Sequence, residues 1–121
     1  MASNECGNDS EKKDRKLVLE DKAVICDMRK VPEAIRDQFL ANLEMVRLGL
    51  TPALPCERLH AAGDGVMELK INGRPAWRCM YVVRRNGDVV VLHATSKTSQ
   101  GQDKQLVKTT SQRLKRLVQD R

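Results

Sequence analysis

The sequence predicts a single α+β domain, in which an antiparallel sheet packs against two helices that precede it and one helix that follows it. Hydrophobic residues recur every three or four positions early in the 121-residue chain and again at its end, as in amphipathic helices. Between these regions the hydrophobic residues alternate with period two, and two Asn-Gly pairs separate the alternating segments. Asn-Gly between apolar runs is typical of hairpin turns, so the middle of the chain is expected to form a meander.

The N-terminal half is expected to hold a polar tail, a short strand and two helices. Residues 1–14 offer almost no side chain to bury and are expected to be a disordered tail, which leaves one domain at 15–121. Residues 16–20 suit a short strand and residues 23–30 a brief helix. Pro32 suits the first turn of a second helix, because the first N–H groups of a helix have no partner within it. The apolar stripe of that helix is formed by Ile35, Phe39, Leu43, Val46 and Leu50.

Three strands and a basic helix are expected after a loop-like stretch at residues 51–65. The strands are expected at residues 66–71, 76–83 and 88–95, joined at Asn72-Gly73 and Asn86-Gly87. A helical pattern with basic residues between its leucines and valines predicts the last helix at 102–118. The resulting order is β-α-α-β-β-β-α. The strand at 89–94 is expected to be interior, because nearly every position in it is apolar.

The turn geometry decides which strand side chains share a face of the sheet. A three-residue loop at Asn72-Gly73 puts Lys70 and Arg78 on one face, and a two-residue loop at Asn86-Gly87 adds His93 to that face. The other face is then expected to form the core, from Met67, Leu69, Ile71, Trp77, Cys79, Tyr81, Val83, Val90, Leu92 and Ala94. The mixed face is expected to carry Glu68, Lys70, Arg78, Met80, Val82, Val89, Val91, His93 and Thr95.

Composition and charge exclude several kinds of protein. No apolar stretch approaches ~18 residues and the polar start is no signal peptide, so a cytoplasmic protein without a membrane segment is expected. The four cysteines are far apart and there are only two histidines, so neither a metal site nor a cofactor is expected. Residues 67–121 hold 12 Lys/Arg and 4 Asp/Glu, against 10 and 12 in residues 1–66. This asymmetry favours a polyanionic partner, although a solvated basic surface has the same composition.

The strand region resembles the RelE/HigB-like toxins of the RelE/ParE superfamily, especially their phage-derived HigB-like branch. That branch reads G-V-Y-E-L-R, then an aromatic–Arg–x–x–Tyr, then V-L-H-A-F-x-K-K-T-Q. The matching residues are Gly65, Val66, Glu68, Leu69, Trp77, Arg78, Tyr81, Leu92, His93, Ala94, Lys97 and Gln100. With the helices on either side, the resemblance covers roughly residues 16–119. The chain departs from the pattern at Lys70, Thr95 and Thr98, which leaves open whether activity is kept, reduced or lost.

The resemblance implies a RelE-like fold and the toxin of a type II toxin–antitoxin system. Such a toxin is a metal-independent endoribonuclease that cuts messenger RNA, typically on the ribosome, and so inhibits translation. It also implies a cognate antitoxin, expected to be of the helix-turn-helix type and to meet the basic half of the chain. Two alternatives stay open: a ParE-like inhibitor that binds DNA gyrase, and a nucleic-acid-binding protein without catalysis. His93 and Lys97 argue against the ParE-like alternative, whereas Thr98 argues weakly for it.

The expected site residues follow from the chemistry of RNA cleavage. The 2′-hydroxyl must lose a proton, the phosphorane must be stabilised, and the 5′-oxygen must gain a proton. His93 is the candidate for proton transfer, because an ordinary histidine titrates at ~6.5, and Arg78 is the candidate phosphate clamp. Lys70 and Lys97 would stabilise charge, with Lys97 as the preferred proton donor.

These residues also have plainer interpretations, as a strand-end histidine and as solvated surface cations. The same holds for the residues expected to bind the RNA backbone, which are Arg74, Arg84, Arg85, Lys104 and Lys108, with Arg113, Lys115 and Arg116 as further candidates.

Overall fold

The predicted α+β fold is confirmed by a computed structural model, which describes residues 15–19, 21–97 and 103–119. The tail predicted at 1–14 lies outside the described residues. The helices are α2 (Lys22–Lys30), α3 (Glu33–Arg47) and α4 (Lys104–Gln119), with a 3-10 turn η1 (His60–Ala62). The strands are β1 (Leu17–Val18), β2 (Cys56–Arg58), β3 (Met67–Ile71), β4 (Ala76–Val83) and β5 (Val89–Lys97).

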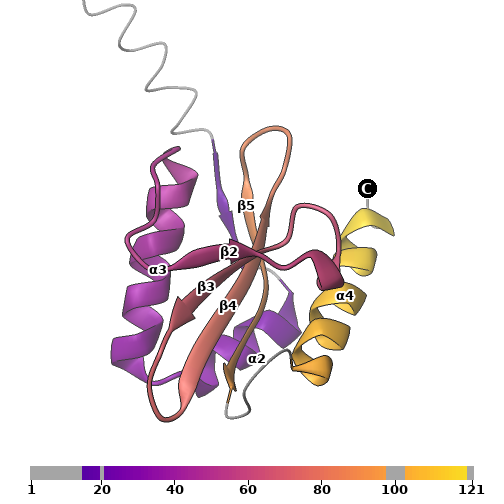
Figure 1. The fold of residues 1–121 in the computed structure, drawn as a ribbon. Coiled ribbons are helices and arrows are strands. Elements are labelled where there is room, and N and C mark those ends of the chain that lie inside the picture. The colour runs from indigo at the N-terminus through magenta and orange to yellow at the C-terminus, as the bar shows by residue number, and fades with distance from the viewer. Residues whose placement is uncertain (1–14, 20, 98–102, 120–121) are drawn as a thin grey trace, which may run out of the picture.

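The sheet has five strands in the order β1-β5-β4-β3-β2 (Figure 1). Helices α2 and α3 pack on one face, and α4 packs on the other. Strand β5 lies between β1 and β4, and each residue from Val89 to Ala94 is buried. The expectation that this strand is interior is therefore confirmed.

Two features of the sheet differ from the sequence prediction. Strand β1 pairs with β5 in parallel, at Leu17–Val89 and Val18–Val90, so the sheet is only mostly antiparallel. Strand β2 lies in the stretch interpreted as a loop, and it pairs with β3 at the far edge. Both elements have only two or three residues, too few to show a hydrophobic period, and distant partners determine them.

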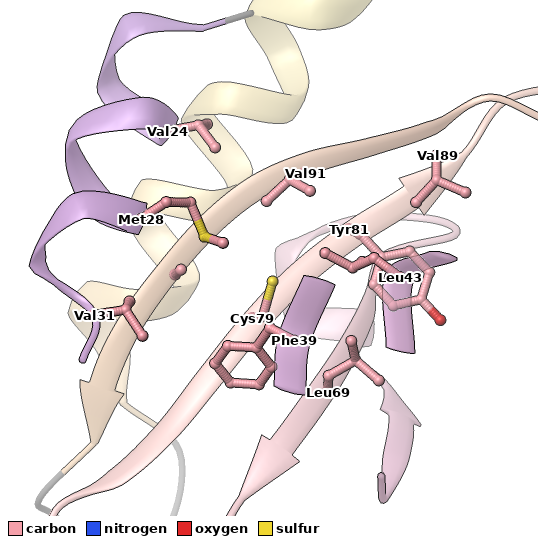
Figure 2. Close-up of a cluster of buried hydrophobic side chains, with 11 residues drawn as sticks. Val24, Met28, Val31, Phe39, Leu43, Leu69, Cys79, Tyr81, Val89 and Val91 are labelled. Carbon is pink, nitrogen blue, oxygen red and sulfur yellow. The ribbon is translucent and has the colours of Figure 1, made fainter. Parts of the chain in front are cut away.

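The face under α2 and α3 carries the larger core. Leu69, Cys79, Tyr81, Val89, Val91 and Ala94 from the sheet meet Val24 and Met28 of α2, Val31, and Phe39 and Leu43 of α3 (Figure 2). Burial raises the pKa of the Cys79 thiol to about 12, so this thiol stays protonated at neutral pH. Burial also makes it an unsuitable nucleophile.

The face under α4 carries a second core. Met80, Val82, Val90 and Leu92 of the sheet pack with Leu59, Ala62, Val66 and the α4 residue Leu106. Because β5 supplies residues to both cores, a helix must cover each of its faces. The gap between α2 and α4, along β5, is where charged side chains from all three elements meet.

The loop between β4 and β5 differs from the predicted one, and this changes the faces of the first residues of β5. In the β4–β5 hairpin Val83 pairs with Val89, and the Arg84 N–H donates to the Asp88 carbonyl, which leaves a three-residue loop at 85–87. Gly87 in this loop has a φ of +94° and donates its N–H to the Arg84 carbonyl. The predicted two-residue loop is wrong, so Val89 and Val91 lie in the larger core, and Val90 and Leu92 lie under α4. Val83, predicted in the core, is 48% exposed.

A β-bulge then restores the predicted register further along β5. Tyr81 pairs with Val91 but Met80 pairs with His93, so Leu92 is the extra residue. Beyond it Arg78 pairs with Thr95, and on the other side Arg78 pairs with Lys70. The prediction that Lys70, Arg78 and His93 share a face is therefore confirmed, although the predicted second loop was wrong.

Gly87→Ala is expected to destabilise the fold by about 1 kcal/mol or more, because an alanine is strained at positive φ. The added Cβ would also lie 2.5 Å from Nε of Arg15, whose flexible side chain would have to move. Urea unfolding measures the loss. Arg85→Ala in the same loop is the control, and a loss as large there would show that the loop tolerates no change of side chain at all.

Candidate functional site

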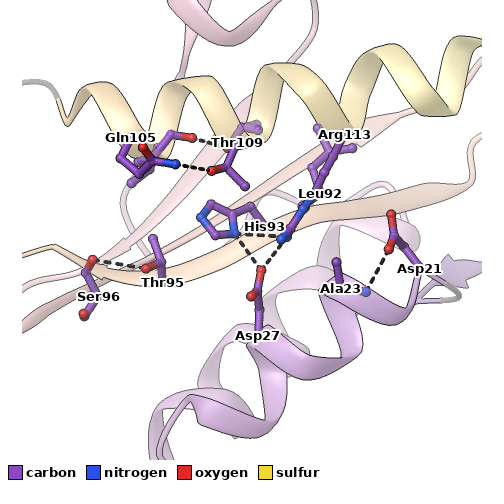
Figure 3. A network of polar contacts seen from close by, with 12 residues as sticks. Asp21, Ala23, Asp27, Leu92, His93, Thr95, Ser96, Gln105, Thr109 and Arg113 are labelled. Carbon is purple, nitrogen blue, oxygen red and sulfur yellow. Dashed lines mark hydrogen bonds and ion pairs between the residues drawn. The ribbon is translucent and has the colours of Figure 1, made fainter.

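His93 is held by a carboxylate and a guanidinium that come from two different helices. Its Nδ1 lies 2.6 Å from Oδ2 of Asp27 on α2, and the histidine is 9% exposed (Figure 3). Arg113 on α4 donates from Nη1 to the same Oδ2 at 2.5 Å and to the Leu92 carbonyl at 3.0 Å. This Asp27–His93–Arg113 network therefore joins α2, β5 and α4.

The network keeps Asp27 ionised and determines which nitrogen of His93 carries the proton. Burial of the carboxyl raises the pKa of Asp27, but hydrogen bonds from His93 and Arg113 and their charges outweigh this effect, so the pKa is lowered. An ionised carboxylate can only accept hydrogen bonds. Nδ1 of His93 must therefore be the donor, and a neutral imidazole then has its lone pair on Nε2.

The second nitrogen of His93, Nε2, takes no part in this network. In Figure 3 it points away from Asp27, and it makes no hydrogen bond to any residue that the structure describes. An imidazole held by a carboxylate at Nδ1, with Nε2 available, is the arrangement that general acid–base catalysis uses. The plainer interpretation, a bond to the backbone at the strand end, does not describe His93.

Lys70 and Lys97 both line a pocket of about 360 Å³ between the sheet and the start of α4, which we call the lysine pocket. Both side chains line it, together with Glu57, Glu68 and Asp103. Lys70 pairs with the exposed Glu57 at 3.0 Å, a contact partly open to solvent that holds the amine weakly. Lys97 makes no ion pair to a described residue, so its charge is available to a bound anion.

Arg78 does not line this pocket; it is buried next to Glu68, which does, and already has partners. Its Nε lies 3.7 Å from Oε2 of Glu68, and both side chains are about one-tenth exposed. Nη1 donates to the Trp77 carbonyl at 2.9 Å, and Nη2 lies 3.4 Å from Oδ1 of Asn72. Arg78 thus neutralises a buried carboxylate, and its guanidinium is directed toward the β3–β4 hairpin.

The candidate RNA-binding residues lie at two ends of the molecule. Arg74 lies in the β3–β4 hairpin, near Lys97, which pairs with Ala76. Lys104 and Lys108 are exposed on the half of α4 that lines the lysine pocket. Arg84 and Arg85 follow β4 at its other end, about 25 Å away along eight residues.

Sequence reasoning missed Asp27 and assigned Arg113 only to a basic surface. Asp27 lies on a nine-residue helix, 66 positions before His93, and nothing near it marks a functional site. The one available signal was its place on the helix, at i+3 from Val24 and next to the buried Met28, where a charged residue needs a partner.

Two classes of site find no support in the described part of the chain. No three of its His, Cys, Asp and Glu side chains are grouped so that they could hold a metal ion. No helix among the described residues is long and apolar enough to cross a membrane.

Comparison with known families identifies one match. The model of a family described as Phage derived protein Gp49-like (DUF891) matches residues 26–115, well over half of the chain. No curated protein and no solved structure matches the chain. The matched region begins within α2 and ends within α4, so it contains Asp27, His93 and Arg113.

Asp27→Asn is expected to lower the free energy of unfolding at pH 7 by about 1–3 kcal/mol, because it removes the charge that His93 and Arg113 face. The pKa of Asp27 is lower in the folded state, so its stabilisation is present above the ordinary value of 3.8 and is lost as the pH falls below it. Urea unfolding from pH 7 to pH 3 should therefore show the two proteins converging. Asp37→Asn, on the exposed side of α3, is the control and should show no such convergence.

Arg78→Met is expected to cost about 3–5 kcal/mol, because it leaves the buried Glu68 carboxylate without its cation. Glu68→Gln combined with Arg78→Met should recover part of that loss. Lys70→Met removes only an exposed ion pair and should cost about 1 kcal/mol or less. Urea unfolding compares the variants. An Arg78→Met protein as stable as the wild type would mean that the ion pair between Arg78 and Glu68 does not stabilise the fold.

Proposed function

Because the chain belongs to the Gp49-like family of phage-derived, toxin-like proteins, we propose that it is the toxin of a type II toxin–antitoxin system. We propose further that it is a metal-independent endoribonuclease of the HigB-like kind, which cuts messenger RNA on the ribosome in the cytoplasm. The observation that carries the proposal is the 2.6 Å contact between Nδ1 of His93 and Asp27, since it leaves Nε2 to exchange a proton. A cognate antitoxin, expected to be of the helix-turn-helix type, is the implied partner.

In the proposed reaction the 2′-hydroxyl of the RNA attacks the adjacent phosphorus. Nε2 of His93 takes the proton of that hydroxyl as the new O–P bond forms. The bond from phosphorus to the 5′-oxygen breaks, and Lys97 donates a proton to the leaving oxygen. Lys70 stabilises the additional negative charge of the phosphorane. The products carry a 2′,3′-cyclic phosphate and a 5′-hydroxyl.

The shared sheet face supports this division of roles. His93 and Lys97 are four residues apart on β5, about 13 Å along the strand, so in the proposed reaction their side chains converge on one phosphate from its two sides. Asp27 acts through His93 and is a positioning residue. Arg78 is proposed to act mainly by neutralising Glu68, because a direct phosphate clamp would require it to leave that carboxylate. Without this neutralisation the pocket would oppose the approach of a phosphate.

Surface cations near Lys97 are proposed to bind the RNA backbone. Arg74, Lys104 and Lys108 are exposed and belong to the same end of the molecule as the lysine pocket. Contacts of this kind add affinity and salt dependence and do not select a sequence. Arg84 and Arg85, at the other end of β4, are then left for contacts with the ribosome or another partner.

His93→Gln is expected to lower cleavage by about 10²–10⁴-fold, because an amide fills the space but does not shuttle a proton. The assay is a cell-free translation reaction programmed with a defined message, in which primer extension maps the RNA ends. His60→Gln is the matched control, since it changes the other, exposed histidine of the chain. Lys97→Ala should also cleave more slowly, and Asp27→Asn should change the pH profile of the rate as well as its size.

Folded His93→Gln protein that cleaves at the wild-type rate would remove His93 from the mechanism. Circular dichroism and urea unfolding establish that each variant is folded. If the wild-type protein cuts no message but inhibits DNA gyrase, the ParE-like alternative replaces this proposal. If it does neither and its expression does not slow growth, the non-catalytic alternative remains.

A further inference from the structure

A second pocket, of about 550 Å³, lies between α2 and α4 beside β5, away from the lysine pocket. Figure 3 shows its surroundings, with Arg113 of α4 and Asp21, the N-cap residue of α2, near Leu92 of β5. Both the volume and the lining are those of a site that takes several side chains or a small ligand. The proposed reaction uses none of this space.

The apolar part of this α2–α4 pocket is entirely aliphatic. It is formed by Val18, Val24, Val90, Val91, Leu92 and Leu117. No aromatic side chain lines it, since Phe39, Trp77 and Tyr81 all belong to the core on the face of α2 and α3. Proteins that hold unpaired bases usually stack them on aromatic rings, whereas a branched aliphatic wall suits leucine, isoleucine or valine. The lining therefore favours a peptide over an RNA.

The charged part of the pocket carries more positive charge than its carboxylates compensate. Arg113 is engaged by Asp27, and Arg116 pairs with Asp21 at 3.1 Å. Lys22 and Arg84 also line the pocket, and neither makes an ion pair with a described residue. Two cations are thus available to acceptors on an incoming molecule.

Arg84 has the clearest need for such an acceptor. Its Nε is buried and has no hydrogen-bond partner among the described residues. A buried donor without a partner costs free energy, which a carboxylate placed in the pocket would recover. The backbone N–H of Arg84 is already bonded to the Asp88 carbonyl, so the β4–β5 hairpin holds this residue in position.

We propose that the α2–α4 pocket is the docking site for an acidic peptide segment of a protein partner. An aliphatic side chain of that segment would fill the valine and leucine wall, and a neighbouring carboxylate would bind Arg84 and Lys22. Such binding does not depend on the proposed reaction. The effect of binding on activity does rest on the proposed function. Arg113 lines the pocket and also donates to Asp27, so an occupant would contact the network that orients His93. In a toxin, the antitoxin is the partner for which this contact is useful.

The test uses NMR of the isotope-labelled full chain with synthetic peptides as probes. The first probe is a 15-residue peptide of glutamates and leucines, with the leucines spaced three and four apart. Two control peptides replace the glutamates by lysine or the leucines by alanine. An unstructured eight-nucleotide RNA is the rival probe. The methyl signals of Val18, Val90 and Leu117 report on the pocket, and those of Leu69 and Leu43 on the core elsewhere.

The acidic, leucine-containing peptide should shift the pocket methyls at micromolar to millimolar concentrations, and both control peptides should shift them much less. Arg84→Met should weaken binding about tenfold, as expected when a charged hydrogen bond is lost. Arg85→Met, the adjacent exposed cation, should leave it unchanged.

Three results would overturn the proposal. The first is no methyl shift at millimolar peptide, and the second is an affinity that Arg84→Met does not change. The third is RNA that shifts these methyls more strongly than the peptide and in an Arg84-dependent way, which would make the pocket a nucleic-acid site. None of these results bears on whether the protein cuts messenger RNA, which the His93→Gln assay decides.

Discussion

Burial of β5 on both faces is the constraint on which the rest of the structure depends. Val89 and Val91 belong to the core on the α2 and α3 face, while Val90 and Leu92 belong to the core under α4. A strand of this kind is stable only if helices cover both of its faces. The two helices that do so, α2 and α4, come from distant parts of the chain, and the gap between them holds most of the charged interactions described above.

The Asp27–His93–Arg113 network is a consequence of that arrangement. His93 lies next to the bulge of β5, between the two covering helices, and each of these helices supplies one charged residue to the network. The network therefore fastens three elements together and orients an imidazole at the same time. Its structural and its chemical role do not compete, because they use different nitrogens of the ring.

Basic side chains that make no ion pair with a described residue line two different pockets, one at each end of α4. The start of α4 borders the pocket with Lys70 and Lys97, which suits a phosphate, and its later turns border the aliphatic pocket with Arg84. One helix thus contacts the proposed reaction site and the proposed partner site.

The sequence by itself determined the fold class, the helices, the positions of the two hairpins and the pairing that puts Lys70 and Arg78 on one face. These depend on hydrophobic period and on turn residues, which are local properties. The tertiary structure alone decided the parallel pairing of β1, the bulge at Leu92 and the pairing of His93 with Asp27. Such features arise from contacts between residues far apart in the chain, and a single sequence carries no local pattern that records which distant residues will meet.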